Sequence, residues 1–299
     1  MLEEFLKYLQ YEKNRSAHTV LSYGIDLKQF QKFYEELTGR NDIESAERSD
    51  IRHWIVKMVN EKGSSATTIG RKLSSLRIFY KFLIKKGVIE VSPMRNIIPP
   101  KKIQPIPAFM TEQEMDRLGE RQKLMLEIDN EDDFIGTRDN LIIEMLYQTG
   151  MRRIELINLK HADIDFDRKT VRILGKRNKV RYVPFGESLE KQIKEYMELK
   201  DKYIPKKEDF LFVIKNGNRL YDKAVYNVVV EKLEPFTTNE KHSPHTLRHT
   251  FATVLLNEGA DLNVVQKLLG HSSLASTQVY THTTFRELQE AYKKSHPRA

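Results

Sequence analysis

Four prolines within nine residues divide this chain into two parts. They lie in the stretch Pro99-Pro-Lys-Lys-Ile-Gln-Pro-Ile-Pro107. Proline lacks a backbone N–H and clashes with the preceding helical turn, so neither a helix nor a central strand continues through such a stretch. We therefore predict a stiff linker at 98–109, between one domain at 1–97 and a second domain at 110–299.

The first part has the pattern of a small bundle of four helices. Apolar residues recur every three or four positions, as on one face of an amphipathic helix, in the segments 2–9, 20–34, 51–58 and 69–83. Ser16 is expected to cap the second helix, and Gly87 to end the fourth. The third helix is expected to begin near Ser49 or Asp50. Amphipathic helices with short connections are typical of a bundle.

The second part combines helical patterns with one predicted β-hairpin. Thr111 and Glu114 have the spacing of a capping box at a helix start, and a core helix through 141–146 is expected to stop at Gly150. Strands are predicted at 170–174 and 180–183 around the turn 175–179, and helices at 189–199 and 222–233. With a mainly helical last third, the chain is expected to be mainly α with a small β-sheet.

The charge balance points to a polyanionic partner. The net charge is +8, and residues 1–110 hold 19 Lys and Arg against 12 Asp and Glu, so the excess lies in the first third. Nucleic acid is the usual partner of such a surface. The acidic stretch 127–133 is expected to face away from it.

Several classes of protein are excluded by composition. The chain has no cysteine, which removes disulfides, thiol nucleophiles and cysteine-based zinc sites. No apolar run reaches the ~18 residues of a membrane span, and the first residues lack the pattern of a signal peptide. We therefore expect a cytoplasmic protein without membrane insertion.

The chemistry-bearing residues gather toward the C-terminus. His245 and Arg248 are three positions apart, Gly270 precedes His271, and Tyr280 follows. Arginine binds phosphate through a planar fork of donors, histidine moves protons near neutral pH, and tyrosine can attack phosphorus. Upstream, an arginine and a glutamate occur in Thr-Gly-Met-Arg152-Arg-Ile-Glu155, and lysines occur in Gly-Lys176-Arg-Asn-Lys179.

In this order and at these spacings, the residues resemble the tyrosine recombinases of the phage integrase family, most closely the bacterial XerC/XerD type. The resemblance covers nearly the whole chain. It implies an N-terminal helical bundle (a SAM-like core-binding domain), a mixed α/β catalytic domain, and two lobes that close around a DNA duplex. It further implies site-specific recombination that needs no cofactor, metal or ATP.

The resemblance also assigns catalytic roles. Arg152 and Arg248 would neutralise the scissile phosphate, and Glu155 would orient a neighbouring site residue. His245 would assist proton transfer from Tyr280, the nucleophile that forms a 3′-phosphotyrosyl link. His271 would donate a hydrogen bond to the phosphate. Lys176 would be the general acid, with Lys179 as the alternative, because Arg177 stands where the family commonly has glycine.

Contacts with double-stranded DNA are expected from three places. They are the fourth helix, through Arg71, Lys72, Ser74, Ser75 and Arg77; the linker, through Lys101 and Lys102; and the hairpin turn, through Arg177 and Lys179. The family assembles as a tetramer on two DNA sites, here with itself or with a second Xer-type recombinase. The helix at 285–292 would be donated to a neighbouring protomer. In chromosome dimer resolution, a septal DNA translocase would be a further partner.

Other functions fit parts of the pattern. An integrase of a mobile genetic element has the same chemistry, and a type IB topoisomerase has a similar site. A non-catalytic DNA-binding protein would not need the complete set of site residues. His245 and His249 have the spacing of a zinc-binding pair, but the intervening Thr-Leu-Arg supplies no glutamate base and adds a cation.

Overall fold

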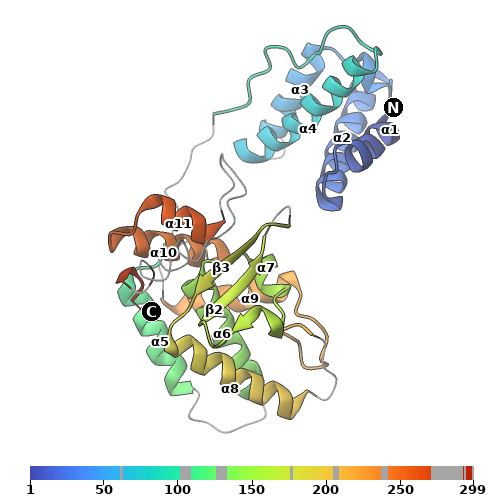
Figure 1. The fold of residues 1–299 in the computed structure, drawn as a ribbon. Helices are drawn as coiled ribbons and strands as arrows, with labels where there is room; N and C mark the ends of the chain where they lie inside the picture. Colours follow the sequence, from blue (N-terminus) through green and yellow to red (C-terminus); the bar gives the residue numbers. More distant parts are fainter. Residues whose placement is uncertain are drawn as a thin grey trace. The chain divides into compact units, whose positions relative to one another are not determined.

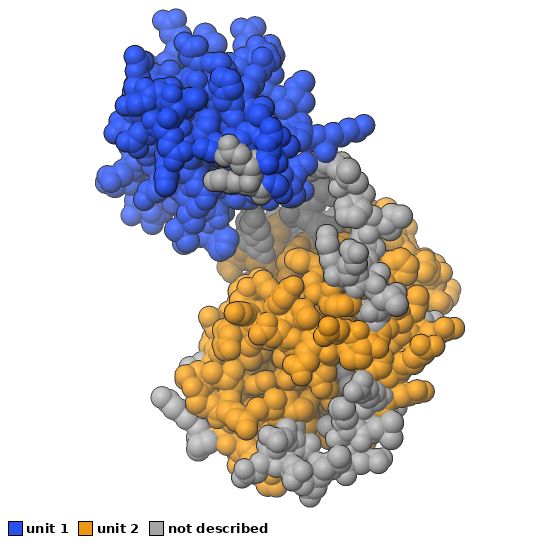
Figure 2. Space-filling model, turned by 180° about the vertical axis from the view of Figure 1, so that it is seen from behind, with its two compact units in different colours: residues 1–105 blue, residues 106–299 orange. Residues whose placement is uncertain are grey.

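The chain forms two compact units, Met1–Pro105 and Ile106–Ala299, which are coloured separately in Figure 2. This is a computed structural model, and it describes residues 1–60, 63–101, 109–125, 133–175, 178–204, 209–236, 242–270, 292 and 294–297. We describe each unit by itself.

The first unit is a helical bundle with an aromatic core. Its elements are α1 (Leu2–Lys7), η1 (Tyr8–Glu12), α2 (Ala17–Thr38), η2 (Ile43–Ser45), α3 (Arg48–Asn60) and α4 (Ala66–Lys85). Phe30 and Trp54 pack with ring centroids 5.0 Å apart, and Phe5 meets Phe79 edge-on at 5.3 Å. Side chains from all four α-helices therefore form the core of the bundle. Figure 1 shows how these helices are arranged.

The ends of these helices follow local sequence. The Ser16 hydroxyl accepts the backbone N–H of Thr19 at 3.3 Å and caps α2, as expected. Ser65 caps α4 in the same way, through the N–H of Thr68 at 3.2 Å. The first helix differs from the prediction, because it passes at Tyr8 into a π-helical turn. The third begins at Arg48, slightly earlier than the pattern indicated.

The second unit wraps helices around a small sheet. Its elements are α5 (Glu112–Met125), α6 (Asp133–Thr149), α7 (Arg153–Ile157), η3 (His161–Asp163), β1 (Ile164–Asp165), β2 (Thr170–Leu174), β3 (Val180–Pro184), α8 (Glu187–Tyr203), α9 (Asp222–Leu233), η5 (Glu234–Phe236), α10 (Pro244–Asn257) and α11 (Leu262–Leu269). The predicted capping box is present, because the Thr111 N–H donates to Glu114 Oε2 at 2.7 Å and the Glu114 N–H donates to Thr111 Oγ1 at 3.3 Å. Helix α6 is central and packs against α8 and α10 (Figure 1).

The sheet is antiparallel in the order β1-β2-β3. Val171 lies opposite Val183, and Ile173 lies opposite Arg181. On β3, Arg181 and Val183 are buried while Tyr182 is exposed, as the two-residue period of a strand requires. The sequence pattern missed β1, because a two-residue strand has no period to detect.

Gly150 ends α6 in a conformation that favours glycine. Its φ is +58°, and a Cβ at this position would lie 2.4 Å from Cδ1 of Phe251 in α10. The missing side chain therefore lets the end of α6 approach α10 closely. This approach places Gly150 and Arg152 beside the helix that carries His245 and Arg248.

The last described residues pack on the second unit itself. Tyr292 is 1% exposed and belongs to the unit's hydrophobic core. Its ring stacks on that of His296 at 5.0 Å, and the His296 ring lies 5.2 Å from that of Tyr147. The predicted helix at 285–292 otherwise lies outside the described residues. Throughout the described ranges, no helix is both long and apolar enough to cross a membrane.

Candidate active site

The catalytic candidates that the structure describes lie at the N-terminal ends of two helices, α7 and α10. Arg152 is the N-cap residue of α7, and Glu155 lies in the first turn of that helix. His245 and Arg248 lie in the first turns of α10. Lys176, Arg177, His271 and Tyr280 lie outside the described residues, as does Lys102 of the predicted linker.

Glu155 is the carboxylate at the centre of this arrangement, with a side chain only 3% exposed. It accepts the backbone N–H of Arg152 at 2.7 Å and the Arg152 guanidinium at 2.9 Å. Burial raises the pKa of this carboxyl, but the hydrogen bonds and charges of Arg181 and Arg152 outweigh burial and hold the pKa below its ordinary value. Glu155 is therefore charged at neutral pH and is bonded to Arg152. Its supporting role in catalysis stays a prediction.

Arg181 on β3 is the second partner of Glu155, and the sequence analysis did not select it. Its two terminal nitrogens donate to the two Glu155 oxygens at 3.0 and 2.8 Å, and its Nε donates to the Leu268 carbonyl at 2.7 Å. The alternation of inward and outward residues along the strand could have identified Arg181. Residue 181 alternates inward with Val183, and an inward arginine requires an acidic partner.

Arg248 is buried and held by backbone carbonyls. Its guanidinium donates to the carbonyl of Gly150 at 2.5 Å and to that of Leu269 at 2.6 Å. Burial, followed by the positive charges of Arg152 and Arg181, lowers the pKa of Arg248 to about 10. Arg248 therefore lies in a field of like charge, which a bound anion would relieve.

His245 is in the same positive environment. Burial lowers the pKa of this imidazole, and the charges of His249, Arg248, Arg153 and Arg152 lower it further. Its neutral form is therefore favoured near neutral pH. A neutral imidazole can accept a proton, which is what a neighbouring tyrosine hydroxyl would have to lose to become a nucleophile.

Arg153 lies near His245 but makes its side-chain contacts with α9. Its guanidinium pairs with Asp222 of α9 at 2.6 Å and lies 5.8 Å from the centre of the Tyr226 ring. The choice of Arg152 over Arg153 as the catalytic arginine stays a prediction of the sequence pattern.

The hairpin turn is closed by one backbone hydrogen bond. The Gly175 N–H donates to the Lys179 carbonyl at 2.7 Å, and Asn178 has a φ of +61°. Lys179 is exposed. Lys179, the alternative general acid, is therefore accessible to solvent.

The predicted DNA-contacting face of α4 requires one correction. Ser75 is fully buried and donates to Asp26 Oδ2 at 2.8 Å, so it cannot face a phosphate backbone. Arg71, about half exposed, pairs with the same carboxylate. The Ser74 hydroxyl donates to the Gly70 carbonyl at 2.8 Å. Some of the polar residues predicted to contact DNA are therefore already bonded within the bundle, where α2 packs against α4.

Lys72 and Arg77 retain accessible surface on α4. Lys72 donates to the Gln29 side chain at 2.6 Å and lies 5.7 Å from the centre of the Trp54 ring. Arg77 donates to the Ile97 carbonyl at 3.2 Å. Lys72 also lines a pocket of about 210 Å³, together with Gln29, Lys32, Phe33, Glu36, Trp54, Lys57 and Met58.

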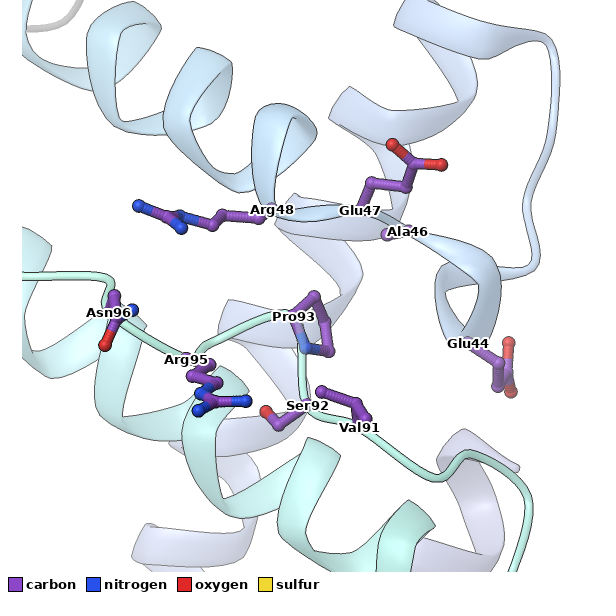
Figure 3. Close-up of a pocket in the computed structure, with 9 residues that line it drawn as sticks. All are labelled: Glu44, Ala46, Glu47, Arg48, Val91, Ser92, Pro93, Arg95 and Asn96. Atoms are coloured by element: carbon purple, nitrogen blue, oxygen red, sulfur yellow. The ribbon is translucent and has the colours of Figure 1, made fainter.

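A larger pocket, of about 370 Å³, lies elsewhere in the first unit and is lined by Glu44, Ala46, Glu47, Arg48, Val91, Ser92, Pro93, Arg95 and Asn96. Its two guanidinium groups, of Arg48 and Arg95, do not point toward one another (Figure 3). None of the predicted site residues lines it.

Comparison with known proteins covers both units. Residues 109–287 match the phage integrase family, and residues 2–87 match the phage integrase N-terminal SAM-like domain. Tyrosine recombinase XerC of Oceanobacillus iheyensis is 40% identical over 302 residues, which span 100% of this chain and 96% of that protein. The protein of the same name in Bacillus subtilis is 38% identical over 299 residues, or 99% of this chain and 95% of the relative.

Two solved structures have a similar fold. The XerH site-specific recombinase, bound to the palindromic difH substrate in a post-cleavage complex, gives a TM-score of 0.71 at 25% identity, covering 97% of this chain and 84% of XerH. The Tn1549 transposon integrase in complex with transposon right end DNA gives 0.70 at 20% identity, over 97% of this chain and 98% of the integrase. At that identity, the second similarity concerns the fold alone.

The chain therefore belongs to the phage integrase family, and it has the family's helical bundle followed by a mainly helical domain with a small sheet. Its full-length similarity is to XerC-type tyrosine recombinases. It is a site-specific tyrosine recombinase, an enzyme that breaks and rejoins DNA strands.

Proposed function

We propose that Arg152 and Arg248 bind the scissile phosphate of a DNA duplex while Tyr280 attacks it. The observation that carries this proposal is the charge of the described cluster. Arg152, Arg181 and Arg248 surround one carboxylate, that of Glu155, so positive charge is in excess. A phosphodiester would supply the missing negative charge.

The proposed reaction conserves the phosphoester bond energy. The Tyr280 hydroxyl loses its proton with help from His245, and its oxygen bonds to phosphorus as the bond to the 5′-oxygen breaks. Lys176, or Lys179 in its place, protonates the leaving 5′-oxygen, and His271 donates a hydrogen bond to the phosphate. Attack by the 5′-hydroxyl of a second strand then releases the tyrosine, so neither ATP nor a metal is required.

The substrate we propose is double-stranded DNA. Lys72 and Arg77 on α4, Lys101, and the turn with Arg177 and Lys179 would contact the phosphate backbone, together with Arg71. Support comes from their exposure where they are described and from the positive charge of residues 1–110.

The biological role we propose is chromosome dimer resolution in the cytoplasm. Similarity to XerC over the whole chain favours this role over integration of a mobile element, since the transposon integrase match supports only the fold. A tetramer on two DNA sites would carry out this reaction. It would consist of this chain alone or of this chain and a second Xer-type recombinase, and a septal DNA translocase would act as a partner.

Covalent trapping tests the chemistry directly. Protein is incubated in EDTA with pooled nicked duplexes carrying candidate sites and then resolved on a denaturing gel. We expect a protein–DNA adduct that is absent for Tyr280→Phe, while both proteins bind the same duplexes. An equal adduct in the variant would assign the nucleophile elsewhere. An adduct that forms only after Mg²⁺ is restored would contradict the metal-free mechanism.

A further inference from the structure

Arg181 brings together three segments that are distant in sequence. It lies on β3, its side chain is 4% exposed, and it contacts Glu155 of α7 and the Leu268 carbonyl of α11. Gly175 and Gly270 lie against it as well. A Cβ on Gly175 would come within 3.7 Å of Arg181 Nη1, and a Cβ on Gly270 within 3.2 Å of Arg181 Cδ. These glycines immediately precede Lys176 and His271 in the chain.

The contact with Arg181 fixes both the position and the orientation of the Glu155 carboxylate. Two parallel N–H···O bonds from Arg181 set both the position and the plane of the carboxylate, which a single donor would not do. Its oxygens are then aimed so that Oε2 accepts the Arg152 backbone N–H and Oε1 accepts the Arg152 guanidinium. The direction of the Arg152 side chain therefore depends on the fork of Arg181.

The third donor of Arg181 acts on the other side of the site. Its Nε binds the Leu268 carbonyl, and the next carbonyl, that of Leu269, accepts from Arg248. Two arginines thus hold consecutive carbonyls at the end of α11. Displacement of Arg181 would disturb the anchorage of Arg248 and the start of the segment that continues to His271.

A buried ion pair alone would not require this geometry. Replacing such a pair by apolar residues of similar size is often neutral or favourable for stability. We propose that Arg181 is a positioning residue of the recombinase, an inference that rests on the proposed function. It aligns Arg152 through Glu155 and holds the end of α11, and it does not itself touch the phosphate.

The test compares Arg181→Lys with Arg172→Lys, a matched change on the adjacent strand at an arginine that is 46% exposed and paired with Asp163. Lysine keeps the charge of Arg181 and loses its fork. Single-turnover adduct formation is measured at saturating nicked duplex, with DNA affinity and the unfolding transition measured in parallel. We expect a roughly 10- to 100-fold slower reaction for Arg181→Lys, since small misplacements at a site have effects of that order.

Two further results separate positioning from bulk stability. Affinity for DNA should change less than about threefold. The rate effect should be smaller in an Arg152→Lys background, because the part that passes through Glu155 acts on Arg152. Rates that multiply independently would overturn the proposal, as would a folded Arg181→Lys that reacts like the wild type. If the wild type itself forms no adduct, the proposed function fails instead.

A second variant covers the case in which Arg181→Lys does not fold. The double change Arg181→Met with Glu155→Leu replaces the whole ion pair by apolar side chains, so no buried charge is left unpaired. We expect this protein to fold and bind DNA but to form adduct at least about tenfold more slowly. A wild-type rate in the folded double variant would contradict a positioning role for Arg181.

Discussion

Arg248 is a buried cation whose hydrogen-bond partners are uncharged backbone carbonyls. The two carbonyls that hold it, those of Gly150 and Leu269, satisfy hydrogen-bond donors without neutralising charge. The guanidinium therefore stays electrostatically unsatisfied, and its pKa falls to about 10. If the scissile phosphate binds here, as we propose, it would gain from a charge that the fold has already desolvated.

Replacing Arg248 by lysine should expose this dependence. The lysine ammonium donates from a single atom and lacks the planar fork that reaches the two carbonyls, so we expect adduct formation to slow by roughly 10²- to 10³-fold. Single-turnover cleavage at saturating DNA measures the effect. Arg219→Lys, at an exposed arginine bonded to Asn158 at 2.9 Å, is the control and should react normally. A similar loss in both would show that the effect does not depend on the position of Arg248.

Glu155 should give the second unit an acid-sensitive contribution to stability. Its pKa is lower in the folded state than in the unfolded chain, so the folded state binds this proton less readily. The contribution is fully present above the unfolded value, near pH 4.5, and is lost as the pH falls through the lower folded value. Unfolding followed by circular dichroism between pH 7 and about pH 3 measures it.

Glu155→Gln is the informative comparison. It should lower stability at pH 7 by roughly 3–5 kcal/mol, because Arg181 is left buried without its counter-charge. The difference between the two proteins should shrink on acidification. A constant difference across this range would show that the ionised form of Glu155 is not what stabilises the fold.

At the scale of elements, the junction of α6 and α10 shows why backbone conformation matters to the site. Gly150 has a positive φ and no room for a side chain beside Phe251. Gly150→Ala should therefore cost about 2–4 kcal/mol, from the left-handed backbone and from overpacking together. It should also slow cleavage, because the Gly150 carbonyl binds Arg248.

Gly136→Ala provides the matched control within the same helix. A Cβ at Gly136 meets nothing within 4 Å, so the change should be neutral or stabilise α6 by about 0.5–1 kcal/mol. Thermal unfolding of both variants measures this difference in stability, and adduct formation measured in parallel gives the effect on cleavage. Equal stability of Gly150→Ala and Gly136→Ala would mean that the packing at Phe251 relaxes at no cost.

Elements with a clear period were predictable from sequence, and contacts between elements were not. The helices α2, α4, α8 and α9 follow the apolar spacing, and Ser16 and Thr111 act at helix starts as their types suggested. Ser75 was misassigned because its burial depends on Asp26 in another helix. Arg181 was missed for the same reason, since its importance lies in reaching α7 and α11.

At the scale of the whole molecule, the end of the chain is part of the core. Tyr292 is buried in the second unit, and the Ser295 hydroxyl donates to the Glu258 carbonyl at 3.4 Å. Donation of the segment at 285–292 to a neighbouring protomer, which remains a prediction, would therefore require these contacts to open. Assembly and the stability of the second unit are then linked.

A truncation after Thr284 tests this link. It removes Tyr292 and His296, so we expect a less stable second unit and the loss of cooperative occupation of two adjacent DNA sites in a gel-shift titration. Tyr292→Phe is the control. It deletes only a buried hydroxyl for which the described residues supply no hydrogen-bond partner, and it should leave both properties intact. Cooperative binding by the truncated protein would contradict donation of this segment.

The chain has a single tryptophan, Trp54, and it lies in the core of the first unit. Its indole packs on Phe30 and lies beneath the ammonium of Lys72. Fluorescence excited at the red edge of protein absorption comes from tryptophan. It therefore reports on the helical bundle alone, because the second unit has no tryptophan. Without an engineered label, tryptophan fluorescence can therefore follow the unfolding of Met1–Pro105 separately from that of the second unit.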